Sequence, residues 1–347
     1  MISEKSKSIR VDLKHAEKVR KYLSKIGLLR DDLEIFKDNQ FIYFPIKGIS
    51  KGLTKYTIVE KEFIQRKIKP SSYKDLIYLP KSLINILPNS YDIIGNIALV
   101  KLSDALLEYY AVIGDSLIST NKNIKAVFQV EPVSGELRTR KIRLISGIKN
   151  TETVHKEYGL QFEVDVKKTY FSPRLANERK RVSSIVKPGE TVVDMFAGVA
   201  PFSIMIAKYA NPKIVYAIDK NKDAIKFAKK NILKNKVLDK VEVIHADAKD
   251  TKRIFKERNV MADRIIMNLP FSACDFFKNA LEISSNISII HHYDIANEGD
   301  IRYILNKLKE IAEGSGFSLE KLKVKKIKSY SPREFYIGID ITAKKKT

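Results

Sequence analysis

Residues 191–202 read TVVDMFAGVAPF, an apolar strand pattern that runs through Asp194 and Gly198 into the start of a helix pattern. A glycine at such a turn lets the backbone approach a ligand closely. The segments IVYAID, VEVIHAD and RIIMNLP are further short strands of the buried type, separated by helix-like stretches such as NKDAIKFAKKNILKN. Alternating strands and helices predict a parallel, doubly wound α/β sheet, whose ligands bind outside the carboxyl ends of the strands.

Polar residues stand at the ends of the next three strands. Asp219 ends IVYAID, where a carboxylate can accept both ribose hydroxyls of a nucleoside. Asp247 ends the third strand and Asn268-Leu269-Pro270 the fourth. Each alone is more often a cap or turn residue, and the turn at Gly198 alone is equally compatible with an ordinary βα turn. Four such ends in order, without a G-x-G-x-x-G fingerprint, favour a nucleoside cofactor that lacks a pyrophosphate, and S-adenosylmethionine fits.

The chain before this sheet divides into two smaller parts. The first has a helix pattern ending at Gly27, two strand patterns and a basic, Pro-Ser-Ser linker near residue 70. The second has a strand pair turned at Gly95, a helix and further strands, which indicates an α+β domain. We therefore predict a Rossmann-like domain preceded by an α+β domain and a small N-terminal α+β module. The predicted domains are residues 1–68, 72–167 and 168–347.

The composition points to a polyanionic partner. The 347 residues include 64 Lys and Arg against 41 Asp and Glu, a net charge of +23, and such an excess favours phosphate contacts. No apolar run approaches the ~20 residues of a spanning helix, and the N-terminus lacks a signal-peptide core, so no membrane partner is expected. Cys274 is the single cysteine, which rules out a disulfide within the chain and predicts a cytosolic, cytoplasmic protein.

Together these motifs resemble the archaeal and eukaryotic family of tRNA (guanine-37 N1) methyltransferases. The resemblance rests on DMFAGVAPF (194–202), AID (217–219) and NLP (268–270), and it extends to YFSPRLANER (170–179) and KSYSPRE (328–334). It covers nearly the whole chain. It implies S-adenosylmethionine as the cofactor and tRNA as the partner, bound through its anticodon loop and through a distant part that the N-terminal module contacts. A monomer is expected.

The resemblance also implies roles for single residues. N1 of guanine carries a proton at neutral pH, so methylation there needs a general base and a donor for the charge growing on O6. By resemblance Glu178 is the base, Arg138 is the O6 partner and Tyr170 positions the target base, while Asn268 and Pro270 shape its pocket. The residues that match the cofactor shell are Arg179, Phe196, Gly198, Asp219, Asp247, Ala248 and Asn268.

Simpler interpretations remain open for several of these residues. Glu178 lies among arginines and would suit a surface ion pair. Arg138, Arg140 and Arg143 are each suited to a phosphate contact, and alternation places the first two on one strand face. No metal is predicted, because the closed zinc patterns are missing. His291 and His292 are instead expected at a strand end on the sheet edge. Cys274 has no apparent activating group, so a nucleophilic role is not expected.

Two departures from the family pattern bear on function. Ala200 stands where the family usually has a second glycine, which is tolerated if its φ angle is negative. Residues 271–275, FSACD, replace a segment that often contains Lys and His. The alternative is a wyosine-pathway enzyme on the same scaffold, and this segment keeps open its version that methylates carbon of 4-demethylwyosine, alone or in addition to guanine N1. The other version transfers an aminocarboxypropyl group. A non-catalytic tRNA-binding protein is the rival from another class, and the charge of +23 argues against a small-molecule methyltransferase.

Overall fold

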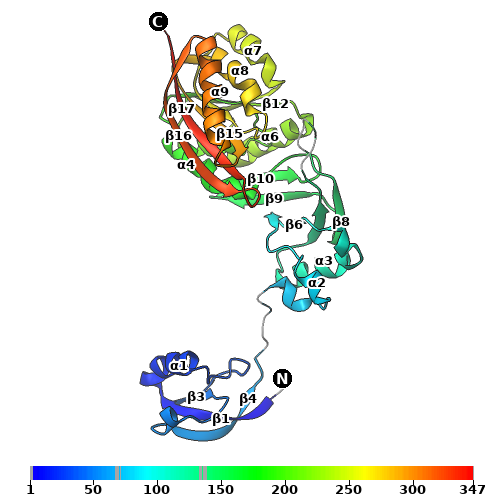
Figure 1. Cartoon of the computed structure of the whole chain (residues 1–347), viewed down its shortest axis with the longest axis vertical. Coiled ribbons are helices and arrows are strands. Elements are labelled where there is room, and N and C mark those ends of the chain that lie inside the picture. The colour runs from blue at the N-terminus through cyan, green and yellow to red at the C-terminus, as the bar shows by residue number, and fades with distance from the viewer. Residues whose placement is uncertain (1–2, 67–69, 71, 133–134, 136–138, 347) are drawn as a thin grey trace. The chain divides into compact units, whose positions relative to one another are not determined.

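The computed structural model describes residues 3–66, 70, 72–132, 135 and 139–346. The chain divides into two compact units, Met1–Asp75 and Leu76–Thr347 (Figure 1). The predicted linker near residue 70 falls largely on residues outside the described ranges.

The first unit is a four-stranded antiparallel sheet with one helix. Its strands occur in the order β2-β3-β1-β4, and α1 buries Val19 and Leu23 in a core with Ile9 and Phe44. The helix and both strands expected from the sequence are confirmed. The elements are β1 (Ser3–Asp12), η1 (Leu13–His15), α1 (Ala16–Lys25), β2 (Phe36–Lys37), β3 (Phe41–Pro45), η2 (Lys51–Leu53) and β4 (Thr57–Ile64).

The second unit opens with a four-stranded sheet in the order β5-β6-β7-β8. The predicted turn at Gly95 joins β5 to β6. Its φ is +57°, and an added Cβ would lie 2.1 Å from Thr153 Oγ1, so only glycine fits. The elements are η3 (Tyr73–Leu76), which spans the boundary between the units, α2 (Lys81–Ile84), β5 (Asp92–Ile94), β6 (Ile97–Val100), η4 (Asp104–Tyr109), α3 (Tyr110–Thr120), β7 (Ala126–Val130) and β8 (Ile142–Gly147).

The hairpin of β9 (Glu152–Glu157) and β10 (Leu160–Asp165) follows. The free edge of β10 is met by a helix instead of a strand. Two asparagines one turn apart on α6 (Lys222–Asn235) make the contacts that a neighbouring strand would make: Asn231 pairs with the backbone N–H and C=O of Glu163, and Asn235 does the same for Gln161. These four hydrogen bonds attach the hairpin to the larger sheet.

That larger sheet has seven strands in the order β13-β12-β11-β14-β15-β17-β16. The first five strands are parallel to one another, whereas β17 is antiparallel to both of its neighbours, β15 and β16. The predicted doubly wound, Rossmann-like fold is thereby confirmed. Besides α6, its elements are η5 (Pro173–Leu175), α4 (Ala176–Ile185), β11 (Thr191–Asp194), α5 (Pro201–Tyr209), β12 (Ile214–Asp219), β13 (Val241–His245), η6 (Ala248–Asp250), α7 (Thr251–Glu257), β14 (Ala262–Met267), η7 (Ala273–Phe276), α8 (Phe277–Glu282), β15 (Ser284–Ala296), α9 (Asp300–Gly314), β16 (Phe317–Ser329) and β17 (Phe335–Lys345).

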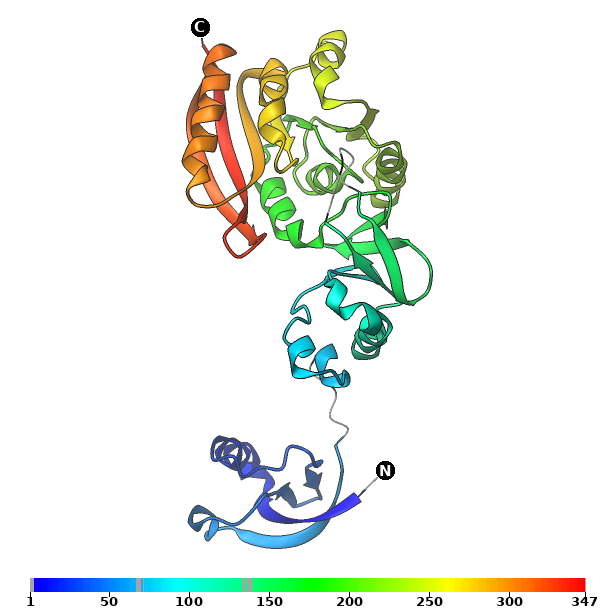
Figure 2. The ribbon, with the colours of Figure 1, turned by 45° about the vertical axis from the view of Figure 1, so that its right-hand side comes forward.

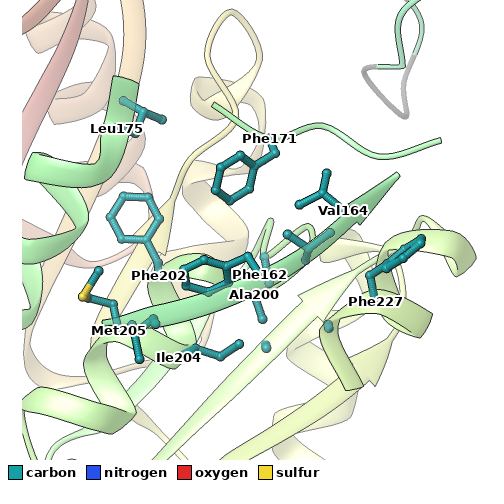
Figure 3. Close-up of a cluster of buried hydrophobic side chains, with 14 of the residues drawn as sticks. Phe162, Val164, Phe171, Leu175, Ala200, Phe202, Ile204, Met205 and Phe227 are labelled. Atoms are coloured by element: carbon teal, nitrogen blue, oxygen red, sulfur yellow. The ribbon is translucent and has the colours of Figure 1, made fainter. Parts of the chain in front are cut away.

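Helices bury both faces of this sheet (Figure 2). Side chains of α4, α5 and α6 fill one core, and those of α7, α8 and α9 fill the other. The first core continues into the hairpin and the smaller sheet: Phe162 and Phe171 lie in one cluster with Phe202 (Figure 3). One hydrophobic core therefore runs across residues 167 and 168, where the sequence predicted a domain boundary. That boundary stays a prediction.

The position predicted for His291 and His292 is wrong. Both lie inside β15, which pairs with β14 on one side and β17 on the other, and they are 1% and 0% exposed. His291 Nδ1 donates to Asp340 Oδ1 at 2.7 Å, and its Nε2 accepts from the Arg264 guanidinium at 2.8 Å. The pattern of short apolar strands gave no sign that β15 would be a long central strand.

Candidate functional site

A cavity of about 1000 Å³ opens at the carboxyl ends of the parallel strands. It collects residues from the loops after β11, β12, β13 and β14, together with the segments around Tyr170 and Lys328. Most of the residues selected from the sequence line it: Tyr170, Arg179, Phe196, Gly198, Asp219, Asp247, Ala248, Asn268 and Pro270.

Asp219 is held by the backbone at the cavity wall. Its Oδ2 accepts from Gly198 N at 2.7 Å, and its Oδ1 accepts from Asn221 N at 2.8 Å. Gly198 has φ +56°, a left-handed conformation that favours glycine. Each carboxylate oxygen keeps a further acceptor site, so Asp219 can receive two hydroxyls. This arrangement fits the ribose of a nucleoside cofactor. Burial raises the pKa of Asp219 above its ordinary value.

Another part of the cavity wall is apolar with one acid. Ala248 is buried, and Phe196 packs edge-on against Phe276 with ring centroids 5.1 Å apart. Asp247 caps η6 by accepting from Lys249 N at 2.9 Å. Its cap role and its place in the cavity wall are compatible, because a carboxylate has acceptor sites to spare.

Ala200 does not meet the condition under which an alanine is tolerated. Its φ is +65°, in the left-handed region, directly before Pro201 opens α5. A Cβ in this conformation costs roughly 1–2 kcal/mol. Ala200 is fully buried in the hydrophobic core, where its methyl group recovers part of that cost by packing. Ala200 itself does not line the cavity formed by the described residues.

Asn268 and Tyr170 also line the cavity. The Tyr336 hydroxyl donates to Asn268 Oδ1, which leaves the amide Nδ2 of Asn268 as a donor. The Arg140 guanidinium lies 5.6 Å from the centre of the Tyr170 ring. Arg140 precedes β8, so the predicted placement of Arg140 on a strand face is wrong. Arg138, the predicted O6 partner, lies outside the described residues.

Glu178 is not brought to this cavity. It is only 6% exposed and does not appear in the wall formed by the described residues. Both carboxylate oxygens accept from Arg181, at 2.6 and 2.7 Å, and Oε1 also accepts from the Tyr293 hydroxyl at 2.8 Å. Arg181 in turn binds Asp340 on β17 at 3.0 Å. The geometry shows an ion pair, as the simpler interpretation expected, but a buried one.

Arg179 combines a place in the cavity wall with a structural contact. Its side chain is 2% exposed and makes a two-point ion pair with Glu157 of β9, at 2.7 and 2.5 Å. It also donates to the backbone carbonyl of Ser172 at 3.2 Å. Arg179 therefore joins α4 to the β9-β10 hairpin beside the site.

Lys328 and Arg174 also line the cavity, although the sequence did not identify them as site residues. The Lys328 amine donates to Ser172 Oγ at 3.2 Å and lies 5.0 Å from the Tyr336 ring centre. Burial lowers the pKa of Lys328 to about 8. Arg174 pairs with Asp92 at 2.6 Å. Both residues belong to quoted motifs, YFSPRLANER and KSYSPRE, whose basic residues were the available signal.

A polar cluster lies behind the loop that departs from the family pattern. His292 Nε2 is 3.9 Å from Cys274 Sγ and 3.5 Å from Asp294 Oδ2. Burial raises the pKa of Cys274 to about 11, so the thiol stays protonated at neutral pH and is a poor nucleophile. Because both contacts use the same ring nitrogen, the three residues do not form a proton relay.

Comparisons with known proteins identify the family of the chain. The TRM5/TYW2 methyltransferase domain matches residues 153–320, the TYW2 N-terminal domain residues 74–151, and the tRNA methyltransferase 5 N-terminal domain residues 8–55. The chain is 40% identical to tRNA (guanine(37)-N(1))-methyltransferase Trm5b of Pyrococcus abyssi over 335 residues, 96% of this chain and 98% of that protein.

Solved structures extend this likeness to the fold. Crystalline wild-type Trm5b from Pyrococcus abyssi has a TM-score of 0.81 at 39% identity and covers 98% of this chain and 99% of its own. The complex of aTrm5 and tRNALeu has a TM-score of 0.78 at 33% identity, with 96% and 99% covered.

A second kind of relative is also present. The tRNA(Phe) (4-demethylwyosine(37)-C(7)) aminocarboxypropyltransferase of Methanocaldococcus jannaschii is 35% identical over 254 residues, 72% of this chain and 96% of that protein. The family predicted from the sequence motifs is confirmed: the chain belongs to the TRM5/TYW2 methyltransferase family.

Proposed function

We propose that this protein transfers a methyl group from S-adenosylmethionine to N1 of guanine-37 in tRNA. The observation that carries the proposal is the match to Trm5b over 96% of the chain. The match to the aminocarboxypropyltransferase relative covers only 72% of this chain. In addition, residues 8–55 match the tRNA methyltransferase 5 N-terminal domain. The net charge of +23 suits a tRNA partner.

The residues of the cavity fit the cofactor. Asp219, oriented by two backbone N–H groups, would hold the ribose hydroxyls. Ala248 and Phe196 would enclose the adenine, with Asp247 placed for its amino group. When bound, S-adenosylmethionine supplies the electrophilic methyl group. The residues of the cavity would position the acceptor nitrogen for attack on this group, and such positioning supplies much of the rate acceleration.

The target guanine would occupy the end of the cavity beside Asn268 and Pro270, with Tyr170 as its aromatic wall. Because an anticodon-loop base is stacked, it must first be extruded into this pocket. The motif match assigns proton removal from N1 to Glu178 and stabilisation of O6 to Arg138. For Glu178 this role requires its carboxylate to exchange a hydrogen bond from Tyr293 or Arg181 for one from guanine N1.

The division of labour within the chain is proposed as well. Residues 1–68 would contact a part of tRNA distant from the anticodon, residues 72–167 would supply Arg138 near the target base, and residues 168–347 would perform catalysis. We propose a monomer in the cytoplasm. Within the described residues, helices long and apolar enough to cross a membrane are absent.

Labelled cofactor separates the proposal from its alternative. The protein is incubated with unmodified tRNA and with S-adenosylmethionine labelled either on the methyl group or on the carboxyl carbon, and the nucleosides are analysed. We expect N1-methylguanosine carrying only the methyl label, and no product when guanine-37 is replaced by adenine. Carboxyl label in the product, formed only from a 4-demethylwyosine tRNA, would establish aminocarboxypropyl transfer instead.

A second measurement distinguishes the proposed enzyme from a non-catalytic tRNA-binding protein. An intact cofactor site should raise the melting temperature when S-adenosylhomocysteine binds, by an amount that grows with ligand concentration. Asp219→Ala is expected to abolish this shift, because it removes the carboxylate proposed to hold the ribose. A protein with no shift and no methyl transfer would be the tRNA-binding alternative.

A further inference from the structure

Phe271 has an unusual backbone for a large residue. Its φ is +74°, in the region that favours glycine, yet its side chain is 58% exposed and lines the cavity mouth. Bulky residues are rarely found there, and no burial of the ring compensates for the strain within the described residues. Conformations of this kind cluster at ligand sites, where the surrounding structure enforces them.

The surroundings of Phe271 do enforce it. Its backbone N–H donates to Asp294 Oδ1 at 3.1 Å, and the same oxygen accepts from Ile295 N at 2.8 Å. His292 lies against the other oxygen of Asp294. The buried polar cluster behind the loop therefore holds Phe271 with its ring directed out of the core.

A second exposed aromatic residue meets this ring. Tyr330, from the loop between β16 and β17, is 50% exposed and also lines the cavity. The two ring centroids are 5.6 Å apart at an interplanar angle of 75°. Tyr330 N donates to Glu334 O at 2.9 Å, which closes its own loop. Two loops that are 59 positions apart in the sequence thus present one aromatic pair beside Pro270.

Extrusion of the target base creates a need that the exposed pair of Phe271 and Tyr330 can meet. When guanine-37 leaves its stack, the nucleobase next to it loses a stacking partner and needs a new one. Exposed aromatic rings are the usual replacement in RNA recognition. We propose that Phe271 and Tyr330 form a stacking platform for the nucleobase adjacent to the target guanine. This inference rests on the proposed function.

Charge identifies the occupant as nucleic acid. The same cavity is lined by Lys328, Arg140 and Arg174, and a polyanion bound there brings its bases to the mouth where the rings lie. These basic side chains would not attract an apolar peptide, and they would repel a second copy of this basic chain.

A substrate-based double-mutant cycle tests the platform. Binding of tRNA transcripts is measured for wild type, Phe271→Leu and Tyr330→Leu, with intact transcripts and with transcripts that carry an abasic nucleotide on the 5′ or the 3′ side of guanine-37. Leucine keeps apolar bulk and backbone strain but removes the ring. Tyr303→Leu is the matched control, because Tyr303 is 70% exposed on α9 and does not line the cavity.

On intact tRNA we expect each platform variant to bind about 5- to 100-fold more weakly and Tyr303→Leu to bind normally. With the abasic nucleotide on one side, the variants should equal wild type, because the stacking base is already missing. A loss of equal size on intact and on both abasic transcripts would overturn the proposal, and so would no loss at all. Wild-type turnover on intact tRNA reports separately on the proposed function.

The variant Phe271→Gly distinguishes a role of the ring in tRNA binding from a role in protein stability. Glycine relieves the strained backbone, so the melting temperature should rise while tRNA binding weakens. A fall in both quantities would mean that the ring serves stability, and the platform would be rejected.

Discussion

Asp194 at the end of β11 shows how a single buried charge influences stability. Its Oδ2 accepts from Ser203 Oγ at 2.9 Å, whereas Oδ1 lacks a hydrogen bond within the described part of the chain. Burial, together with the nearby charge of Asp219, raises the pKa of Asp194 from 3.8 to about 7. The folded protein therefore binds a proton that the unfolded chain releases.

A group with a raised folded pKa stabilises fully below its unfolded pKa, and this contribution is lost as pH rises through the folded pKa. For Asp194 the window is about pH 4 to 7. We expect Asp194→Asn, measured by urea unfolding, to be more stable than wild type at pH 8, by roughly 4 kcal/mol at most, and similar at pH 4. Asp239→Asn, at an exposed site, should show no such change. A difference independent of pH would contradict the assignment.

Lys328 predicts a pH dependence of tRNA binding. Burial lowers its pKa to about 8 in the free protein, so the amine loses its charge between pH 7 and 9. If it contacts a phosphate, wild-type affinity for tRNA should fall by roughly tenfold over this range, whereas Lys328→Arg, charged throughout, should change less. Dissociation constants at constant salt test this, and identical pH profiles would remove Lys328 from the binding surface.

Glu178 requires a test that separates catalysis from structure. As general base its loss should lower single-turnover methylation by roughly 10²–10⁴. We expect this for Glu178→Gln, which can still accept from Tyr293 and so keeps much of the buried contact. Tyr293→Phe is the control, since it removes the hydrogen bond without touching the carboxylate. If Glu178→Gln changes the melting temperature but not the rate, the residue is structural.

Whether the position of a site residue could be predicted depends on how far along the sequence its contacts lie. Asp219, Asp247 and Asn268 could be predicted because strand ends of a parallel sheet converge by topology. The position of Glu178 could not, because Tyr293 and Asp340, which determine it, lie more than a hundred positions away on β15 and β17. Pairwise side-chain contacts between distant strands leave no local pattern.

At the scale of elements, α6 acts as a substitute strand. Asn231 is fully buried and bonds both backbone groups of Glu163 as well as Val199 O at 3.2 Å. A helix presents side chains at positions i and i+4 on one face, so Asn231 and Asn235 bond the backbone of two alternate residues of β10, Glu163 and Gln161. This explains why the hairpin needs no third strand.

Asn231→Ala should therefore destabilise the protein by about 2–3 kcal/mol, because it leaves the N–H and C=O of Glu163 without their partner. Lys229→Ala, at an exposed position of the same helix, should change stability by under ~0.5 kcal/mol. Chemical denaturation of both variants measures the difference. Equal stabilities would show that water replaces the asparagine.

Two elements with a clear apolar pattern were predicted, and two polar strands were not. IVYAID and NKDAIKFAKKNILKN correspond closely to β12 and α6. The strands β1, SEKSKSIRVD, and β9, ETVHKE, were missed because their inward positions include polar residues: Ser8, for example, is buried and donates to Val59 O at 2.9 Å. A hydrogen bond made across a sheet replaces the hydrophobic alternation that signals a strand.

At the scale of the whole molecule, the two units suggest separate tasks. Removal of residues 1–75 should leave stabilisation by S-adenosylhomocysteine unchanged, because the cavity lies within Leu76–Thr347. It should lower kcat/KM for a complete tRNA at least tenfold but not that for an isolated anticodon stem-loop. Equal losses on both RNAs would mean that the first unit contacts the anticodon arm or only supports the fold.

The edge position of β16 in the seven-stranded sheet has a consequence for the protein at high concentration. An open edge carries unpaired backbone groups on which another chain can add a strand, and β16 is 13 residues long. Its exposed positions include Lys321 and Lys323, whose repulsion between two copies opposes edge-to-edge pairing. We therefore expect the positive charge that suits tRNA to protect this edge from strand addition by a second copy, and neutralisation of these lysines to weaken that protection.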